Sequence, residues 1–125
     1  MEDGALDSLA SAAHGEVVLE TGLSYTPEHA VSVRIRKRDQ RYDLDDDGTA
    51  VRLAGEPPGW WGIAEGLMTA HGLNVNRRGV VFVPAVVGRD VRALALSVAD
   101  TSRTLYLALI ESDVEVGFDS DTSVE

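Results

Sequence analysis

The spacing of hydrophobic residues divides the first half of the chain into short strands. Residues 16–21 are rich in β-branched side chains and are bounded by Gly15 and Gly22, which is typical of a strand. Apolar and polar residues then alternate over 31–36 and again over 42–44, as expected for strands buried on one face. Asp47-Gly48 is a strong hairpin-turn signal, so we expect the chain to return as a further strand over 51–53.

The second half of the chain alternates between helical spacing and one further hairpin. Apolar residues recur every three or four positions over 60–71, and Gly72 fits the end of that helix. Two short apolar runs, 73–75 and 80–83, flank a turn at 76–79. Helical spacing resumes from Gly88 and continues to Glu111. Gly62 and Gly66 weaken the helix over 60–71, which suggests close packing there against another element or subunit.

Together these elements predict an α+β fold. With a short helix over 3–14, the order is helix, three or four strands, helix, two strands, helix. Neighbouring strands this close in sequence pair antiparallel, so we expect a two-layer domain with a sheet of five or six strands and helices on one face. Residues 1–111 form this single domain, and residues 112–125 are predicted to be a flexible acidic tail.

Composition limits the cellular location and the kinds of chemistry that we expect. The 125 residues include no cysteine, which excludes disulfides, thiol catalysis and cysteine-bound metals. The N-terminus does not resemble a signal peptide, and no apolar run approaches the roughly 20 residues that a membrane span needs. We therefore expect a cytoplasmic protein that does not bind membranes.

The net charge of −10 is unevenly distributed. Residues 21–110 hold all eleven basic residues and ten acidic ones, so the body is nearly neutral and the acidity belongs to the ends. This balance opposes nucleic-acid binding. The alternating arginines of the strand segment 34–41 nevertheless form a basic face, which keeps a nucleic-acid-associated regulator as an alternative; charge of this kind also protects strands from aggregation.

An acidic hairpin at residues 43–48 offers a second alternative, a metal site. Its sequence matches the first half of a calcium-binding loop, with candidate ligands Asp43, Asp45 and Asp47. The match ends at Ala54, where the calcium loop requires a bidentate glutamate. In the simpler interpretation these carboxylates are the solvated tip of a hairpin.

The sequence favours a binding module over an enzyme. His14, His29 and His71 are scattered, no metal-binding histidine spacing is present, and no glycine-rich phosphate loop follows a strand. We therefore expect no catalytic residue and no cofactor.

Adjacent tryptophans supply the clearest signal for a protein interface. Side chains of neighbouring helical residues point about 100° apart, so Trp60 and Trp61 cannot both be buried against one surface. Tryptophan is also enriched among interface residues. Our candidate binding residues combine this pair with the basic face and its neighbouring strand: Trp60, Trp61, Arg34, Arg36 and Tyr42.

Two resemblances extend this interpretation. The segment from Tyr42 to Gly48, followed by a helix and an apolar hairpin, resembles a family of small bacterial and phage proteins of unknown function that share a Tyr-x-Leu-x-Asp-Asp-Gly hairpin. The order of elements is similar to that of bacterial type III secretion chaperones, which are small acidic dimers that bind an extended partner segment. The second resemblance implies a chaperone-like adaptor, acting as a homodimer through protein–protein contacts.

Overall fold

The computed structural model describes the backbone of residues 14–124 and the side chains of residues 15–112. Its centre is a sheet of five antiparallel strands in the order β1-β2-β3-β5-β4. The strands are β1 (His14–Thr26), β2 (His29–Arg38), β3 (Arg41–Asp45), β4 (Asn74–Val75) and β5 (Val81–Val86). Strand β1 therefore forms one edge of the sheet, and the two-residue β4 forms the other.

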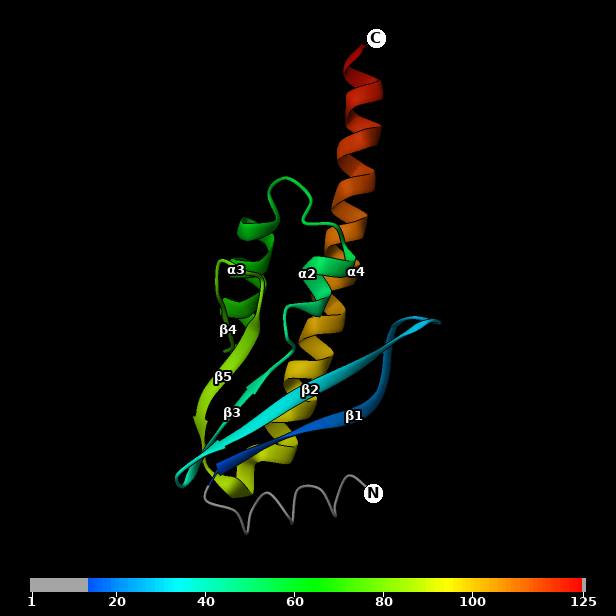
Figure 1. Ribbon diagram of the computed structural model, residues 1–125. Coiled ribbons are helices and arrows are strands. Elements are labelled where there is room, and N and C mark those ends of the chain that lie inside the picture. Colours follow the sequence, from blue (N-terminus) through cyan, green and yellow to red (C-terminus); the bar gives the residue numbers. More distant parts are fainter. Residues whose placement is uncertain (1–13, 125) are drawn as a thin grey trace.

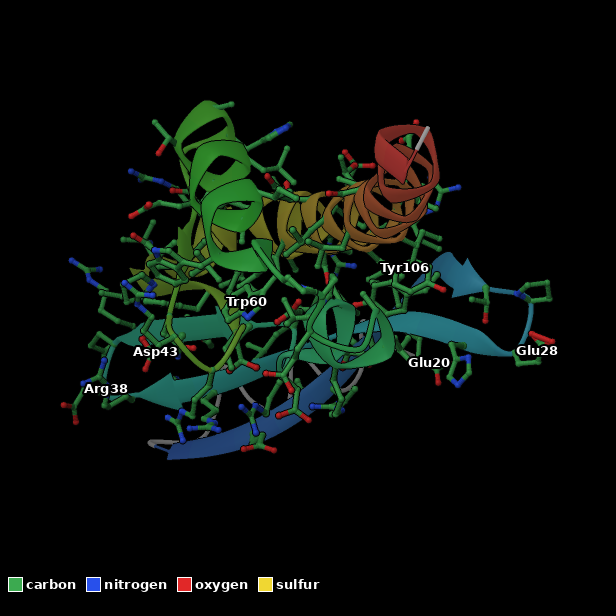
Figure 2. The ribbon with its side chains drawn as sticks, turned by 90° about the horizontal axis from the view of Figure 1, so that it is seen from above. Glu20, Glu28, Arg38, Asp43, Trp60 and Tyr106 are labelled. Carbon is green, nitrogen blue, oxygen red and sulfur yellow. The ribbon has the colours of Figure 1, made fainter. Side chains whose placement is uncertain are left out.

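Among the described residues, the helices lie on one face of this sheet (Figures 1 and 2). Helix α4 (Val91–Val124) follows a short 3-10 turn and contacts β1, β2, β3 and β5. Helices α2 (Thr49–Leu53) and α3 (Trp60–His71) pack against α4. The predicted α+β class, with an antiparallel sheet and helices on one side, is confirmed.

Alternation along the strands builds the core. Val31, Val33 and Ile35 of β2 are fully buried under the helices, whereas the residues between them face the uncovered side. Ile35 lies opposite Leu44 of β3, and α4 contributes a buried row along the same side. That row includes five residues that recur at helical spacing: Val91, Ala95, Val98, Leu105 and Leu109.

The segment after the acidic turn is a helix and not the predicted returning strand. Asp47 and Gly48 do adopt positive φ, at 59° and 72°, as the turn signal requires. The chain then forms α2, whose Ala50 and Val51 are buried. Val51 and Leu53 alone are too short a pattern to distinguish a strand from a single helical turn.

Three other expectations are tested by the structure only in part or not at all. The predicted helix over 3–14 lies outside the described residues except for His14, which begins β1. Helix α4 continues beyond Glu111 to Val124. The predicted flexibility of residues 112–125 is a statement about motion, and it stays a prediction. No described atom lies within 4 Å of a Cβ built on Gly62 or Gly66, so the close packing expected there does not occur within the described chain.

Helix α4 is also more apolar than the sequence analysis allowed. Residues 88–112 are long and apolar enough, by length and composition alone, to cross a membrane. One such helix is weak evidence, because the core helix of a soluble protein has the same properties. The buried row against the sheet uses part of this apolar surface, whereas Leu96 and Leu107 of the same helix are 48% and 40% exposed.

Candidate functional site

The five candidate binding residues lie on two sides of the sheet and do not form one site. Arg34 and Arg36 of β2 face the uncovered side. Trp60 and Trp61 belong to α3 in the helical layer, where Figure 2 shows Trp60. Tyr42 is only 8% exposed and belongs to the core, with the Lys37 ammonium 5.6 Å from its ring centre. Tyr42 therefore supports the sheet and offers little surface for contact.

Arginines dominate the uncovered face, and we call five of them the arginine face: Arg34, Arg36, Arg38, Arg52 and Arg78. They line two adjoining shallow hollows of about 300 and 400 Å³, together with the apolar Val80 and Phe82. Three strands, helix α2 and the loops after β3 and β4 contribute these side chains. The face is therefore assembled from segments far apart in the sequence.

Acidic partners hold part of the arginine face in place. The Arg34 guanidinium donates from Nε to both carboxylate oxygens of Asp45, at 3.1 and 3.2 Å, and lies 3.5 Å from Asp47. Arg38 pairs with Asp43 at 3.0 Å (Figure 2), and Arg36 pairs with Glu16 of β1 at 3.2 Å. These pairs fix where the guanidinium groups stand.

The carboxylates proposed as metal ligands are engaged in hydrogen bonds. Asp43 accepts the main-chain N–H of Ala85 at 2.9 Å, where β5 bulges and Ala85 has a φ of 56°. Asp45 accepts the N–H of Asp47 at 2.8 Å, in addition to Arg34. Within the described part of the chain, no three His, Asp or Glu side chains gather in a group that could hold a metal ion. The metal hypothesis stays a prediction without support from this geometry.

A buried polar network lies behind the same turn. Asp46 is 1% exposed, and its carboxylate accepts the N–H groups of Gly48 and Val81 at 2.8 and 2.9 Å. The Ser102 hydroxyl of α4 donates to it at 2.6 Å and is itself 2.6 Å from the Tyr25 hydroxyl of β1. Burial raises the pKa of Asp46 above its ordinary value, against the hydrogen bonds that lower it. Since Ser102 is fully buried, the network ties elements together and offers no accessible nucleophile.

The tryptophan pair joins α3 to the turn between β4 and β5. The two indole rings meet edge to face, with centres 5.7 Å apart. The Arg77 guanidinium stacks over Trp61 with its central carbon 4.0 Å from the ring centre. Both indoles are half-buried: Trp60 packs against the core, and Trp61 has one face covered by Arg77. A role of this pair in binding stays a prediction.

The edge strand β1 presents the most exposed large hydrophobic residue among those described. Val18 is 58% exposed and lies between Glu16 and Glu20 on the uncovered side. From His14 to Glu20, β1 pairs with β2 in unbroken register, and irregular pairing follows up to Thr26. Strand prediction located this segment, but the sequence carries no local signal that β1 is an edge. That information depends on the order in which all five strands pair.

Comparison with known proteins adds no second line of evidence. No protein-family model matches the chain, and no curated protein or solved structure that was compared with it matches either. The function is therefore argued from the chain's own geometry.

Proposed function

We propose that this protein is a cytoplasmic, non-enzymatic binding module that holds an extended segment of another protein as an added strand along β1. The observation that carries the proposal is the edge position of the 13-residue β1, with Val18 exposed in its regularly paired part. A strand at the edge of a sheet presents unpaired main-chain N–H and C=O groups on its outer side. Added strands use these groups for affinity and the alternating side chains for specificity.

The regular part of β1 defines the length of the binding segment. Residues 14–20 keep unbroken pairing with β2, so their outer edge is straight enough to continue the ladder. Seven residues in an extended strand span about 23 Å. The irregular pairing after Glu20 bends the strand, and such bulges are a common way to end an edge. We therefore expect a partner segment of about seven residues.

Charge along the edge defines the chemistry of the partner. Glu16 and Glu20 flank Val18 on the uncovered side, and Glu20 has no ion-pair partner among the described residues. Antiparallel pairing of two β1 strands centred on Val18 would place Glu16 opposite Glu20, and directly opposed like charges destabilise a sheet. A partner with basic residues on either side of an apolar one would instead form favourable cross-strand pairs. The edge thus favours a basic extended segment over a second copy of β1.

A displayed library of random peptides tests this proposal, with the immobilised full-length protein as bait. We expect enrichment of peptides with a basic, an apolar and a basic residue at alternating positions. Hydrogen exchange should slow at the amides of residues 14–20 when an enriched peptide is added, because these amides gain partners. In a Glu20→Lys variant, the preferred charge opposite position 20 should change from basic to acidic.

Glu65→Lys serves as the matched control, since it makes the same charge change at an exposed site on α3. This variant should select the same peptides as the original protein. The proposal is wrong if the enriched peptides protect amides outside β1, or if Glu20→Lys leaves their charge pattern unchanged.

A further inference from the structure

Two members of the arginine face, Arg52 and Arg78, form no ion pair with any described residue. The four carboxylates beside the face all pair with its other three arginines: Glu16 with Arg36, Asp43 with Arg38, and both Asp45 and Asp47 with Arg34. The five arginines therefore exceed these carboxylates by only one charge. The positive charge that is open to a ligand lies on Arg52 and Arg78.

Arg52 and Arg78 meet at one place, the hollow of about 400 Å³ that Arg34 and Arg36 also line. A Cβ built on Gly48 would lie 3.8 Å from Nη1 of Arg52 and 3.5 Å from the carbonyl oxygen of Arg78. Arg52 reaches the hollow from α2, and Arg78 reaches it from the loop between β4 and β5. The fold thus brings together two unpaired arginines that are far apart in the sequence.

Neutral groups hold Arg52 in position and leave its charge for a ligand. Its guanidinium donates to the carbonyl oxygen of Asp47 at 3.1 Å and to the Thr49 hydroxyl at 3.2 Å. A guanidinium has five N–H donors, so these two bonds leave others for a ligand. Because the group is already positioned, binding an anion costs less side-chain entropy than it would for a freely moving arginine.

Two unpaired guanidinium groups match an anion with two negative charges. A phosphate monoester carries a charge of about −1.5 to −2 at neutral pH and has three acceptor oxygens. Arginine binds such oxygens through two parallel N–H bonds. A carboxylate or a phosphodiester carries one charge and would match only one of the two arginines. Nucleic acid, a chain of phosphodiesters, also needs a more basic surface than this face provides.

We infer that this hollow binds the phosphate group of a phosphate monoester, with Arg52 and Arg78 as its direct ligands. Arg34 and Arg36 border the site, but each already pairs with a carboxylate. Asp47 also lines the hollow, so its charge opposes the bound anion. The site lies on the uncovered face and not on the outer edge of β1. It is therefore independent of strand addition along β1.

Calorimetry on the full-length protein, in a low-salt buffer without phosphate, tests the inference. The probes are glycerol phosphate and a short phosphoserine peptide, and dimethyl phosphate is the comparison with a single charge. We expect glycerol phosphate to bind with a dissociation constant of about 1 mM or below, and dimethyl phosphate to bind far more weakly. Tighter binding of the peptide would identify a phosphorylated side chain as the source of the phosphate. Equal affinity would identify a small free phosphate monoester.

Variants of the lining residues connect binding to the hollow. Arg52→Gln and Arg78→Gln should each weaken glycerol phosphate binding about tenfold, because each removes one charge-assisted contact. Asp47→Asn should strengthen binding, because it removes a negative charge from the hollow. Partial unfolding of a variant would not produce such a gain. Arg89→Gln is the matched control, since Arg89 is exposed on the 3-10 turn before α4 and lines neither hollow.

Three results would overturn the inference. Neither monoester probe binds at about 10 mM, dimethyl phosphate binds as tightly as glycerol phosphate, or the Arg52 and Arg78 variants keep the affinity of the original protein. None of these results bears on peptide binding at β1, which the exchange of amides 14–20 reports separately.

Discussion

At the scale of single residues, Asp46 links several elements through hydrogen bonds, and no sequence motif indicates this role. Its carboxylate joins the turn after β3 to β5 through Val81 and to α4 through Ser102, and Ser102 continues to Tyr25 of β1. The acidic run therefore contains residues with different roles. Asp46 is buried and structural, whereas Asp47, next to it, is 64% exposed at its side chain.

The pKa of Asp46 leads to a prediction about stability and pH. Because burial raises this pKa in the folded state, the ionised carboxylate is favoured less in the folded protein than in the unfolded chain. The contribution of the protonated Asp46 side chain to stability is thus complete below the pKa of the unfolded chain. It is lost as pH rises through the raised pKa of the folded protein. Asp46→Asn keeps a neutral side chain that can accept from the main chain and donate to Ser102. The free energy of unfolding of the original protein should therefore fall relative to that of Asp46→Asn as pH rises from about 4, by at most about 1.4 kcal/mol per pH unit.

Urea unfolding of both proteins between acidic and neutral pH measures this difference. Asp47→Asn removes a neighbouring charge at an exposed site and should show no comparable divergence. If the original protein instead gained stability relative to Asp46→Asn with rising pH, the carboxylate would be stabilised by its three donors more than burial costs it.

At the scale of elements, helix α3 contains two glycines that lower its stability. Gly62 and Gly66 lie on its exposed side, and a Cβ built on either meets no described atom within 4 Å. Replacing a glycine by alanine inside a helix restricts the unfolded chain, so Gly62→Ala and Gly66→Ala should each raise the free energy of unfolding by up to about 1 kcal/mol. Thermal unfolding followed by circular dichroism measures the gain.

Gly79→Ala provides the contrast within the same experiment. Gly79 has a φ of 82°, and a Cβ there would lie 2.8 Å from the Cβ of Val51, so this variant should be destabilised. A loss of stability in Gly62→Ala or Gly66→Ala would instead indicate that another subunit packs closely on α3.

The elements that the sequence predicted well are those with several repeats of one period. Helix α3 begins and ends where its apolar spacing and Gly72 place it, and β2 and β3 contain the alternating segments 31–36 and 42–44. Helix α2 differs from the prediction because the two-residue spacing of Val51 and Leu53 fits a strand, whereas packing of this segment against α4 decided the outcome. Burial of Ala50 and Val51 depends on tertiary packing, which the local sequence pattern does not predict.

The candidate site was predictable only in part, for a related reason. Alternation on β2 correctly placed Arg34 and Arg36 on a shared face away from the core. Arg52 joins that face from α2 and Arg78 from the loop between β4 and β5, which is brought there because β5 inserts between β3 and β4. The exposed edge at Val18 likewise follows from the pairing order. Such residues are brought together by topology, which local spacing does not determine.

At the scale of the whole molecule, α4 is the element on which the others depend. It contacts four of the five strands as well as α2 and α3, and its buried row runs from Val91 to Leu109. A sheet with one uncovered face has no second layer to replace this support. The helix and the sheet should therefore unfold together and not as separate units.

Leu105→Ala tests this dependence. Leu105 is fully buried at the interface between α4 and the rest of the core, so its truncation should lower the free energy of unfolding by about 3 kcal/mol. Far-ultraviolet circular dichroism reports the whole backbone, whereas tryptophan fluorescence reports α3 alone, since both tryptophans lie there. The two transitions should coincide in the original protein and shift by the same amount in the variant. Leu107→Ala, on the same helix but 40% exposed, should change stability by less than about 1 kcal/mol. If Leu105→Ala shifted the dichroism transition and left the fluorescence transition in place, α3 would be a separate folding unit and α4 would not be the common support.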